Sequence, residues 1–232
     1  MIEIKICGLT SLEDALHAAE CGADAVGFIF YPPSPRFISP TDAKRIIERL
    51  PGHITKVGVF VNQHAAEVKK TSEYCNLNLI QLHGDESPKY CHQFSPETIV
   101  KTVFDGKLSS LEDLKSYRVR AFLVDTQRQG LYGGTGLVAD WCFAARIRES
   151  YPSILAGGLK EGNVREAIQV VHPHAMDINS GVEKAPGKKD QEKMKTLIRM
   201  IKDMDQMEGS LPIGIFCGDA GGGLCHGNEI AG

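Results

Sequence analysis

The sequence has little that would suggest nucleic-acid binding, membrane insertion or secretion. Its 232 residues carry a formal net charge of only −3, so there is no basic excess to attract a polyanion. No apolar run is long enough to cross a bilayer. Glu3 and Lys5 interrupt the apolar start of the chain, so we expect no signal peptide. These absences predict a cytoplasmic protein with neither a nucleic-acid nor a membrane partner.

A disulfide framework and a zinc site also lack support in the sequence. The seven cysteines are odd in number, scattered, and never spaced as CxxC, which favours free thiols in a reducing compartment. No HExxH motif occurs, so we expect no metal.

What the chain does contain is a regular alternation of two patterns over its first 205 residues. Apolar β-branched runs predict eight strands, and amphipathic stretches between and after them predict eight helices. Eight strand–helix units match a single (β/α)8 TIM barrel, an α/β fold. The predicted strands lie near 2–7, 25–30, 54–61, 77–83, 97–104, 121–125, 153–156 and 175–179, and the predicted helices near 12–21, 41–50, 64–74, 87–94, 109–116, 138–149, 161–170 and 189–204.

An open doubly wound sheet is the competing architecture. It usually has a GxGxxG turn after the first strand, but the sequence there is CGLTS. The barrel is therefore the preferred fold, spanning residues 1–208. Residues 209–232 are rich in glycine and are expected to form a flexible tail, with a short apolar patch at 211–217.

Polar residues gather where the predicted strands end, which is where barrel enzymes place their active sites. Because side chains alternate along a strand, the polar members of each strand share one face and should line the barrel interior near its mouth. Unpaired buried polar groups are costly, so such a face needs partners or a ligand. The residues are Lys5, Cys7, Gln81, His83, Asp125, Asp177 and Asn179.

Glycine-rich loops follow three of the last strands. Gly157-Gly158 and Ser180-Gly181 follow the seventh and eighth strands, which is the usual phosphate site of a barrel. A third loop, at 130–141, contains Gly134 and could close over the same anion. A Gly–Gly pair alone is most often a turn, but together the three loops predict a phosphorylated small-molecule ligand.

A chemical and a structural explanation both apply to Arg36, Cys7 and Asp125. Arg36 lies in a proline-rich loop after the second strand, where it is either a surface charge or a carboxylate ligand. Cys7 is either core packing or an acid–base group, and Asp125 either caps a loop or transfers protons. His83 is an alternative base.

The motifs together resemble the phosphoribosylanthranilate isomerase family over about residues 2–205. The order and spacing of the motifs fit that family throughout. They are KICGLT at 5–10, GADAVGFIF and SPRFI within 22–38, QLHG at 81–84, VDT at 124–126, GGTG and DW within 133–141, AGGL at 156–159 and SGVE at 180–183.

This resemblance implies a cofactor-free Amadori rearrangement of N-(5-phosphoribosyl)anthranilate in tryptophan biosynthesis. It implies Asp125 as the general acid and Cys7 as the general base. It also implies that Arg36 holds the anthranilate carboxylate, while the loops at Gly157-Gly158 and Ser180-Gly181 hold the phosphate. Gln81, His83 and Gly134 are the remaining candidates for substrate contact, and we expect a monomer or homodimer.

Two features depart from the family pattern, and two rival functions remain. Asn179 stands where the family often has serine, and the extension after residue 208 has no family counterpart. Another phosphosugar barrel, such as indole-glycerol-phosphate synthase, a tryptophan synthase α-subunit or a pentulose-phosphate epimerase, is the nearer rival. A non-catalytic barrel that binds phosphometabolites is the other.

Overall fold

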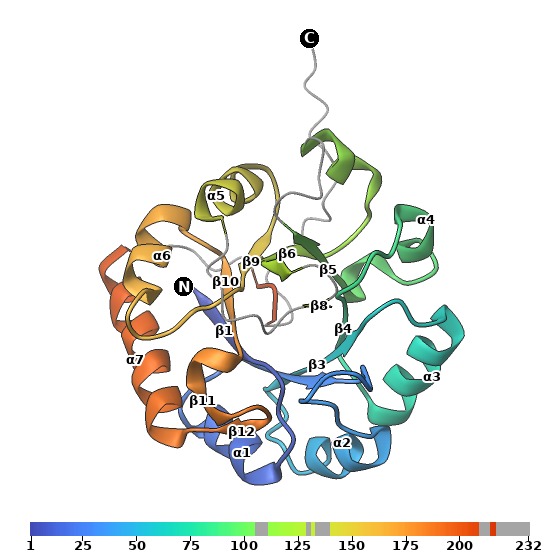
Figure 1. Ribbon diagram of the computed structural model, residues 1–232, viewed down its shortest axis with the longest axis horizontal. Helices are drawn as coiled ribbons and strands as arrows, with labels where there is room; N and C mark the ends of the chain where they lie inside the picture. The colour runs from blue at the N-terminus through green and yellow to red at the C-terminus, as the bar shows by residue number, and fades with distance from the viewer. Residues whose placement is uncertain (105–110, 129–130, 133–139, 209–213, 217–232) are drawn as a thin grey trace.

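Eight parallel strands close into a barrel, as the sequence predicts (Figure 1). The computed structural model of the chain describes residues 1–104, 111–128, 131–132, 140–208 and 214–216. Around the barrel the order is β1-β10-β9-β6-β5-β4-β3-β2. The strands are β1 (Glu3–Ile6), β2 (Ala25–Ile29), β3 (Thr55–Phe60), β4 (Leu79–Leu82), β5 (Ile99–Phe104), β6 (Ala121–Asp125), β9 (Ser153–Leu155) and β10 (Ala175–Ile178).

Helices surround the barrel, and the described residues include seven α-helices. Hydroxyl caps start several: Ser11, Ser39 and Ser87 each accept a hydrogen bond from a backbone N–H three residues later. Among the described residues no helix is long and apolar enough to cross a membrane. The α-helices are α1 (Leu12–Glu20), α2 (Pro40–Ile47), α3 (Ala65–Cys75), α4 (Pro88–Cys91), α5 (Trp141–Ser150), α6 (Val164–Val171) and α7 (Gln191–Glu208).

Two predicted helices are shorter or tighter than expected. The stretch near 87–94 forms only the four-residue α4, and a short 3₁₀ turn follows at Pro96–Thr98 (η1). A proline disfavours helical geometry in the residue before it, here Ser95, so the helix could not have continued through this point. In the next unit, the described residues form a 3₁₀ helix at Leu111–Ser116 (η2) rather than an α-helix.

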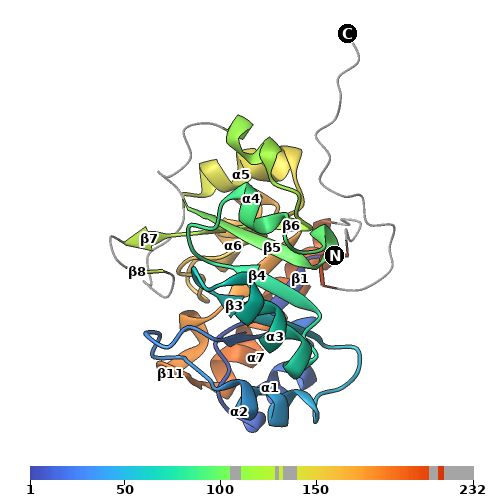
Figure 2. The same ribbon diagram turned by 90° about the vertical axis from the view of Figure 1, so that its right-hand side faces the viewer.

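Two antiparallel ribbons extend the loops after β6 and β10. They pair β7 (Gln127–Arg128) with β8 (Leu131–Tyr132), and β11 (Glu183–Ala185) with β12 (Lys188–Lys189). Between β10 and β11 lies a 3₁₀ turn, η3 (Ser180–Val182). Figure 2 shows the β7–β8 ribbon on the side of the barrel away from the chain's N-terminus, so this side is the mouth.

The alternation of β1 separates two layers of the core. Ile2, Ile4 and Ile6 are buried in the large cluster between the strands and the helices. The opposite face carries Glu3, Lys5 and Cys7 into the barrel, as the alternation predicts. Ile215 and Phe216 of the C-terminal extension pack at the N-terminal end of the barrel interior. The apolar residues that surround them lie near the starts of the other strands and are Ala25, Val57, Leu79, Val100, Ala121, Ile154 and Ala175.

Candidate active site

Lys5 and Cys7 lie side by side within the barrel, with Cys7 nearer the mouth. Lys5 is fully buried, and Cys7 is 4% exposed. Both side chains point at Gly27 on β2: a Cβ atom there would lie 2.8 Å from the Cys7 Sγ and 2.8 Å from the Lys5 Cε. Glycine at this position therefore leaves the space that the two functional side chains occupy.

The Lys5 ammonium group has two partners on opposite sides of the interior. Its Nζ donates to Asp177 Oδ2 at 2.9 Å and to Gln81 Oε1 at 2.6 Å. The second carboxylate oxygen of Asp177, Oδ1, is buried and has no hydrogen-bond partner among the described residues.

Gln81 connects Lys5 to His83, which in turn contacts Asp125. Gln81 Nε2 lies 2.9 Å from His83 Nδ1, and His83 Nε2 lies 3.3 Å from Asp125 Oδ2. The other oxygen of Asp125 accepts from the backbone N–H of Thr126 at 2.7 Å. Three residues predicted from strand ends are thus brought into one connected group.

The donors in this group fix the proton on the His83 ring. An ammonium group can only donate, so Gln81 must accept from Lys5 with its oxygen and present its NH2 to His83 Nδ1. Thr102 Oγ1, at 2.9 Å, can donate to the same nitrogen. His83 Nδ1 is therefore an acceptor, and in the neutral ring the proton is on Nε2, facing Asp125.

The charges around Cys7 act in opposite directions. Burial raises the pKa of the Cys7 thiol, and the negative charge of Asp177 raises it further. The positive charges of Lys5 and Lys189 lower it, but the pKa remains above its ordinary value. The thiol form of Cys7 is therefore favoured at neutral pH without substrate.

Arg36 is held by a carboxylate that the sequence did not point to. Its Nε donates to Glu183 Oε1 at 2.9 Å, and its Nη2 donates to Glu183 Oε2 at 2.7 Å. Lys189, which is fully buried, contacts Glu183 Oε1 at 3.1 Å. Burial opposes the charge on Glu183, but the Arg36 hydrogen bonds and the Lys189 charge keep its pKa below the ordinary value.

The end of β1 passes closely beneath Arg36. Gly8 has a φ of +71°, and a Cβ there would lie 2.9 Å from Arg36 Cδ and 2.7 Å from Asn179 Oδ1. Glycine adopts this conformation without strain and leaves room for both side chains. The Gly8 turn therefore brings Cys7, Arg36 and Asn179 together at the mouth.

The glycine loops predicted to bind phosphate lie against one another. Gly157 and Gly158 have φ values of 85° and 62°, and both are half-buried. A Cβ on Gly181 would lie only 1.8 Å from Leu159 O, so the loop after β10 packs directly on the loop after β9. Ser180 is also half-buried, whereas Gly134 lies outside the described residues.

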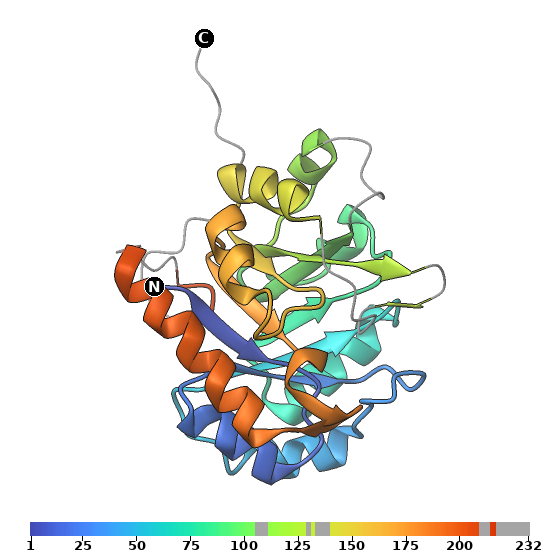
Figure 3. The ribbon, with the colours of Figure 1, turned by 60° about the vertical axis from the view of Figure 1, so that its left-hand side comes forward.

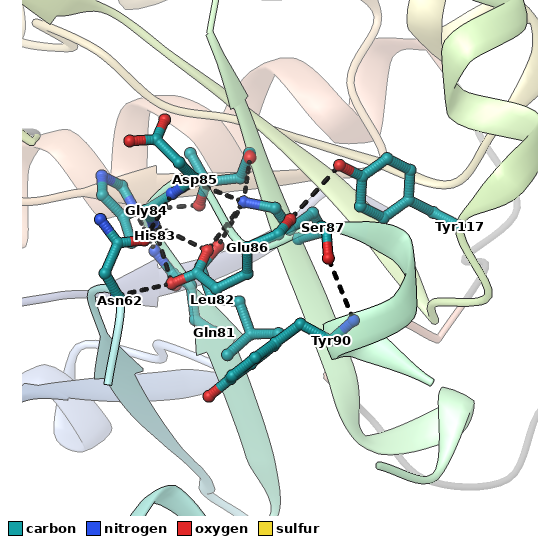
Figure 4. A network of polar contacts seen from close by, with 12 residues as sticks. Asn62, Gln81, Leu82, His83, Gly84, Asp85, Glu86, Ser87, Tyr90 and Tyr117 are labelled. Atoms are coloured by element: carbon teal, nitrogen blue, oxygen red, sulfur yellow. Dashed lines mark hydrogen bonds and ion pairs between the residues drawn. The ribbon is translucent and has the colours of Figure 1, made fainter. Parts of the chain in front are cut away.

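A buried ion pair between Glu86 and Lys101 supports the loop that follows His83, and Figure 4 shows Glu86 among the polar contacts of this loop. Glu86 Oε2 accepts from Lys101 Nζ at 3.0 Å, and the same carboxylate accepts from the backbone N–H groups of Gly84 and Asn62. Lys101 also donates to the carbonyls of Leu82 and Gly84. Sequence reasoning missed this pair, because glutamate and lysine usually lie on the surface.

The chain contains an HxH pattern at 172–174. His172 and His174 precede β10, at the end of the barrel opposite the mouth. Burial lowers the pKa of His174 to about 4, and its Nδ1 accepts from the backbone N–H of Ser153. Among the described residues, no three His, Cys, Asp or Glu side chains are grouped to hold a metal ion.

Comparison with known proteins identifies the family. Residues 4–200 match the model of N-(5'-phosphoribosyl)anthranilate (PRA) isomerase. A PRA isomerase from Syntrophus aciditrophicus is 50% identical over 202 residues, covering 87% of this chain and 88% of that protein. The chain belongs to the PRA isomerase family.

Solved structures of PRA isomerases agree with this assignment. The Thermotoga maritima enzyme is 42% identical, with a TM-score of 0.77, over 88% of this chain and all of that one. Another solved isomerase, 40% identical with a TM-score of 0.74 at the same coverage, holds reduced 1-(o-carboxyphenylamino)-1-deoxyribulose 5-phosphate. The match confirms the predicted family and decides against the rival phosphosugar barrels.

Proposed function

We propose that this PRA isomerase converts N-(5'-phosphoribosyl)anthranilate to 1-(2-carboxyphenylamino)-1-deoxyribulose 5-phosphate with Asp125 as general acid and Cys7 as general base. The observation that carries the proposal is the continuous polar chain inside the barrel. It runs from Lys5, beside Cys7, through Gln81 and His83 to Asp125. Isomerisation needs one group that gives a proton and another that takes one. This row of polar contacts connects the surroundings of two such groups, Cys7 and Asp125.

Asp125 supplies the first proton in this scheme. Its carboxyl group protonates the ring oxygen of the ribose, the bond between that oxygen and C1′ breaks, and the nitrogen lone pair forms a Schiff base. After this transfer the Asp125 carboxylate can accept hydrogen bonds from His83 Nε2, 3.3 Å from its Oδ2, and from the Thr126 N–H, 2.7 Å from its Oδ1. His83 thus positions Asp125 and stabilises the charge that develops on it.

Cys7 completes the rearrangement. Its thiolate removes the proton from C2′, the C–H electrons form a C1′=C2′ double bond, and the iminium nitrogen regains its lone pair. The resulting enolamine gains a proton at C1′ and loses its hydroxyl proton, which gives the ketone product. Lys5 and Lys189 favour the thiolate, because their charges lower the pKa that burial raises.

Two groups of residues fit the two charged ends of the substrate. The guanidinium of Arg36 suits the anthranilate carboxylate, because it offers several donors in one plane. Gly157, Gly158, Ser180 and Gly181 lie where barrels bind phosphate, and their backbone N–H groups suit that anion. Direct substrate contact by Gln81, His83 and Gly134 remains a prediction, as do a cytoplasmic location and a monomeric or homodimeric state.

Turnover by purified variants tests the proposal. We expect the native chain to convert the fluorescent substrate without added metal, with fluorescence falling over time. Asp125→Asn should reduce kcat by roughly 10²–10⁴-fold, the usual contribution of general acid catalysis. Asp203→Asn, at an exposed site on α7, is the matched control and should retain native turnover. Native-like turnover by Asp125→Asn would eliminate Asp125 as the acid.

A further inference from the structure

The segment 214–216 enters the barrel at the end opposite the active site. Ile215 and Phe216 are 1% and 3% exposed, and they pack among apolar residues near the strand starts. In Figure 1 this short segment, coloured red between two grey stretches, lies within the ring of barrel strands. Two large apolar side chains therefore fill the N-terminal end of the barrel interior.

Polar groups of the barrel match the backbone of this segment. Glu3 Oε2 accepts from the N–H groups of Ile215 and Phe216, at 2.6 and 3.0 Å. Arg120 donates from Nε to Ile215 O at 2.6 Å and from Nη2 to Gly214 O at 2.5 Å. Thr55 Oγ1 donates to the carbonyl of Phe216.

These contacts have the features of a built binding site. Glu3 is 4% exposed, and burial of its carboxylate is costly unless hydrogen-bond donors satisfy it. The two backbone N–H groups of the segment are such donors. The site therefore matches a short apolar segment by its side chains and by its backbone.

The segment lies outside the part of the chain that is shared with the family. The PRA isomerase model ends at residue 200, and 202 residues of this chain cover all of the relative from Geobacter metallireducens. The catalytic residues described above all precede residue 200. The 214–216 contacts are thus an addition to the shared barrel, remote from its chemistry.

We propose that the N-terminal end of the barrel is a binding site for an apolar Gly-Ile-Phe segment. Residues 214–216 of the same chain occupy it as a plug that stabilises the barrel and leaves the isomerisation unchanged. Occupation from within the chain follows from the position of α7, whose end lies beside the chain's N-terminus in Figure 3.

Thermal unfolding of the full-length chain tests the plug. Replacing Ile215 and Phe216 together with alanine should lower Tm by about 5–10 °C, because two buried apolar side chains are lost. The kcat at 25 °C should stay within about twofold of native, since the active site lies at the other end. If the double variant folds poorly, the single variant Phe216→Ala provides the test, and its drop in Tm should be smaller.

A matched control separates burial from side-chain loss. Val170→Ala removes an apolar side chain that is 42% exposed on α6, and its Tm should equal the native value. A Tm for both plug variants equal to that of Val170→Ala would overturn the proposal. So would backbone N–H groups of Ile215 and Phe216 that exchange with deuterium as fast as an unstructured peptide.

The concentration dependence of Tm distinguishes the chain's own segment from that of a second copy. A plug from the same chain predicts one Tm between about 1 and 100 µM protein, because no association step contributes. A Tm that rises with concentration, together with a dimer whose mass is lost in the double variant, would contradict the intramolecular plug.

Discussion

The two ends of the barrel interior are built from the same strands but from different chemistry. Along β1 the inward face runs from Glu3 through Lys5 to Cys7. At the N-terminal end of the interior, which we call the base, Glu3 accepts hydrogen bonds from backbone N–H groups and is surrounded by apolar side chains. Toward the mouth, Lys5 pairs with Asp177, and the ion pair Arg36–Glu183 and the His83–Asp125 contact lie nearby.

The contrast shows where the chain uses burial for stability and where it uses it for chemistry. Apolar burial at the base stabilises by about 1.5–3 kcal/mol for each large side chain. Buried ion pairs at the mouth lose much of their Coulomb energy to desolvation, so they are a poor way to gain stability. They do, however, hold proton donors and acceptors in fixed positions, which acid–base catalysis needs.

The pair Glu86–Lys101 offers the strongest way to break this comparison, because it lies near the mouth and supports the fold. Glu86→Gln keeps the shape of the side chain but leaves the buried Lys101 ammonium without its charged partner. Removing one partner of a buried pair costs about 3–5 kcal/mol, so Tm should fall by roughly 10 °C.

Calorimetry of Glu86→Gln beside Glu112→Gln measures this effect. Glu112 is 73% exposed and pairs with Lys115, so its loss should leave Tm unchanged. We also expect lower turnover in Glu86→Gln at temperatures where it is folded, because the Gly84 loop follows His83 directly. An unchanged Tm would mean that Glu86 does not stabilise the mouth.

Arg36→Lys should sharpen the comparison with a smaller effect that is confined to substrate binding. Lysine keeps the charge but loses the paired donors, so KM should rise about 10–100-fold, from about 1.5–3 kcal/mol of charge-assisted hydrogen bonding. The kcat should change less, since Arg36 does not transfer protons. Steady-state kinetics beside Arg45→Lys, an exposed arginine on α2, measures the split. A fall in kcat at unchanged KM would contradict the assigned role.

Much of the barrel and its mouth could be predicted because the signals are local. Apolar β-branched runs located the strands, and the alternation of side chains along the first strand predicted that Lys5 and Cys7 point inward. The rule that barrel sites lie at strand ends then selected Gln81, His83 and Asp125. Contacts between these three side chains join them into one group, and their roles in binding and catalysis are proposals.

The remaining features depend on contacts between distant parts of the chain. Glu183 reaches Arg36 across 147 residues through a loop and a ribbon that no periodic pattern predicts. The burial of Ile215 and Phe216 could not be predicted either, because a short apolar patch in a glycine-rich tail fits many environments. The sequence pattern for a helix at 109–116 was also uninformative about 3₁₀ geometry, which depends on local packing.

The pH dependence of kcat/KM in native protein and in Cys7→Ser tests the central claim most directly. Because the pKa of the Cys7 thiol is raised, its thiolate fraction grows with pH on the alkaline side of the ordinary thiol value. We predict that native kcat/KM, which reports the groups of the free enzyme, rises with pH along a limb that titrates above this ordinary value. In Cys7→Ser this limb should disappear and kcat should fall by roughly 10²–10⁴-fold, as expected for loss of a general base. A limb retained at the same pH in Cys7→Ser would contradict the account and assign the base to another residue.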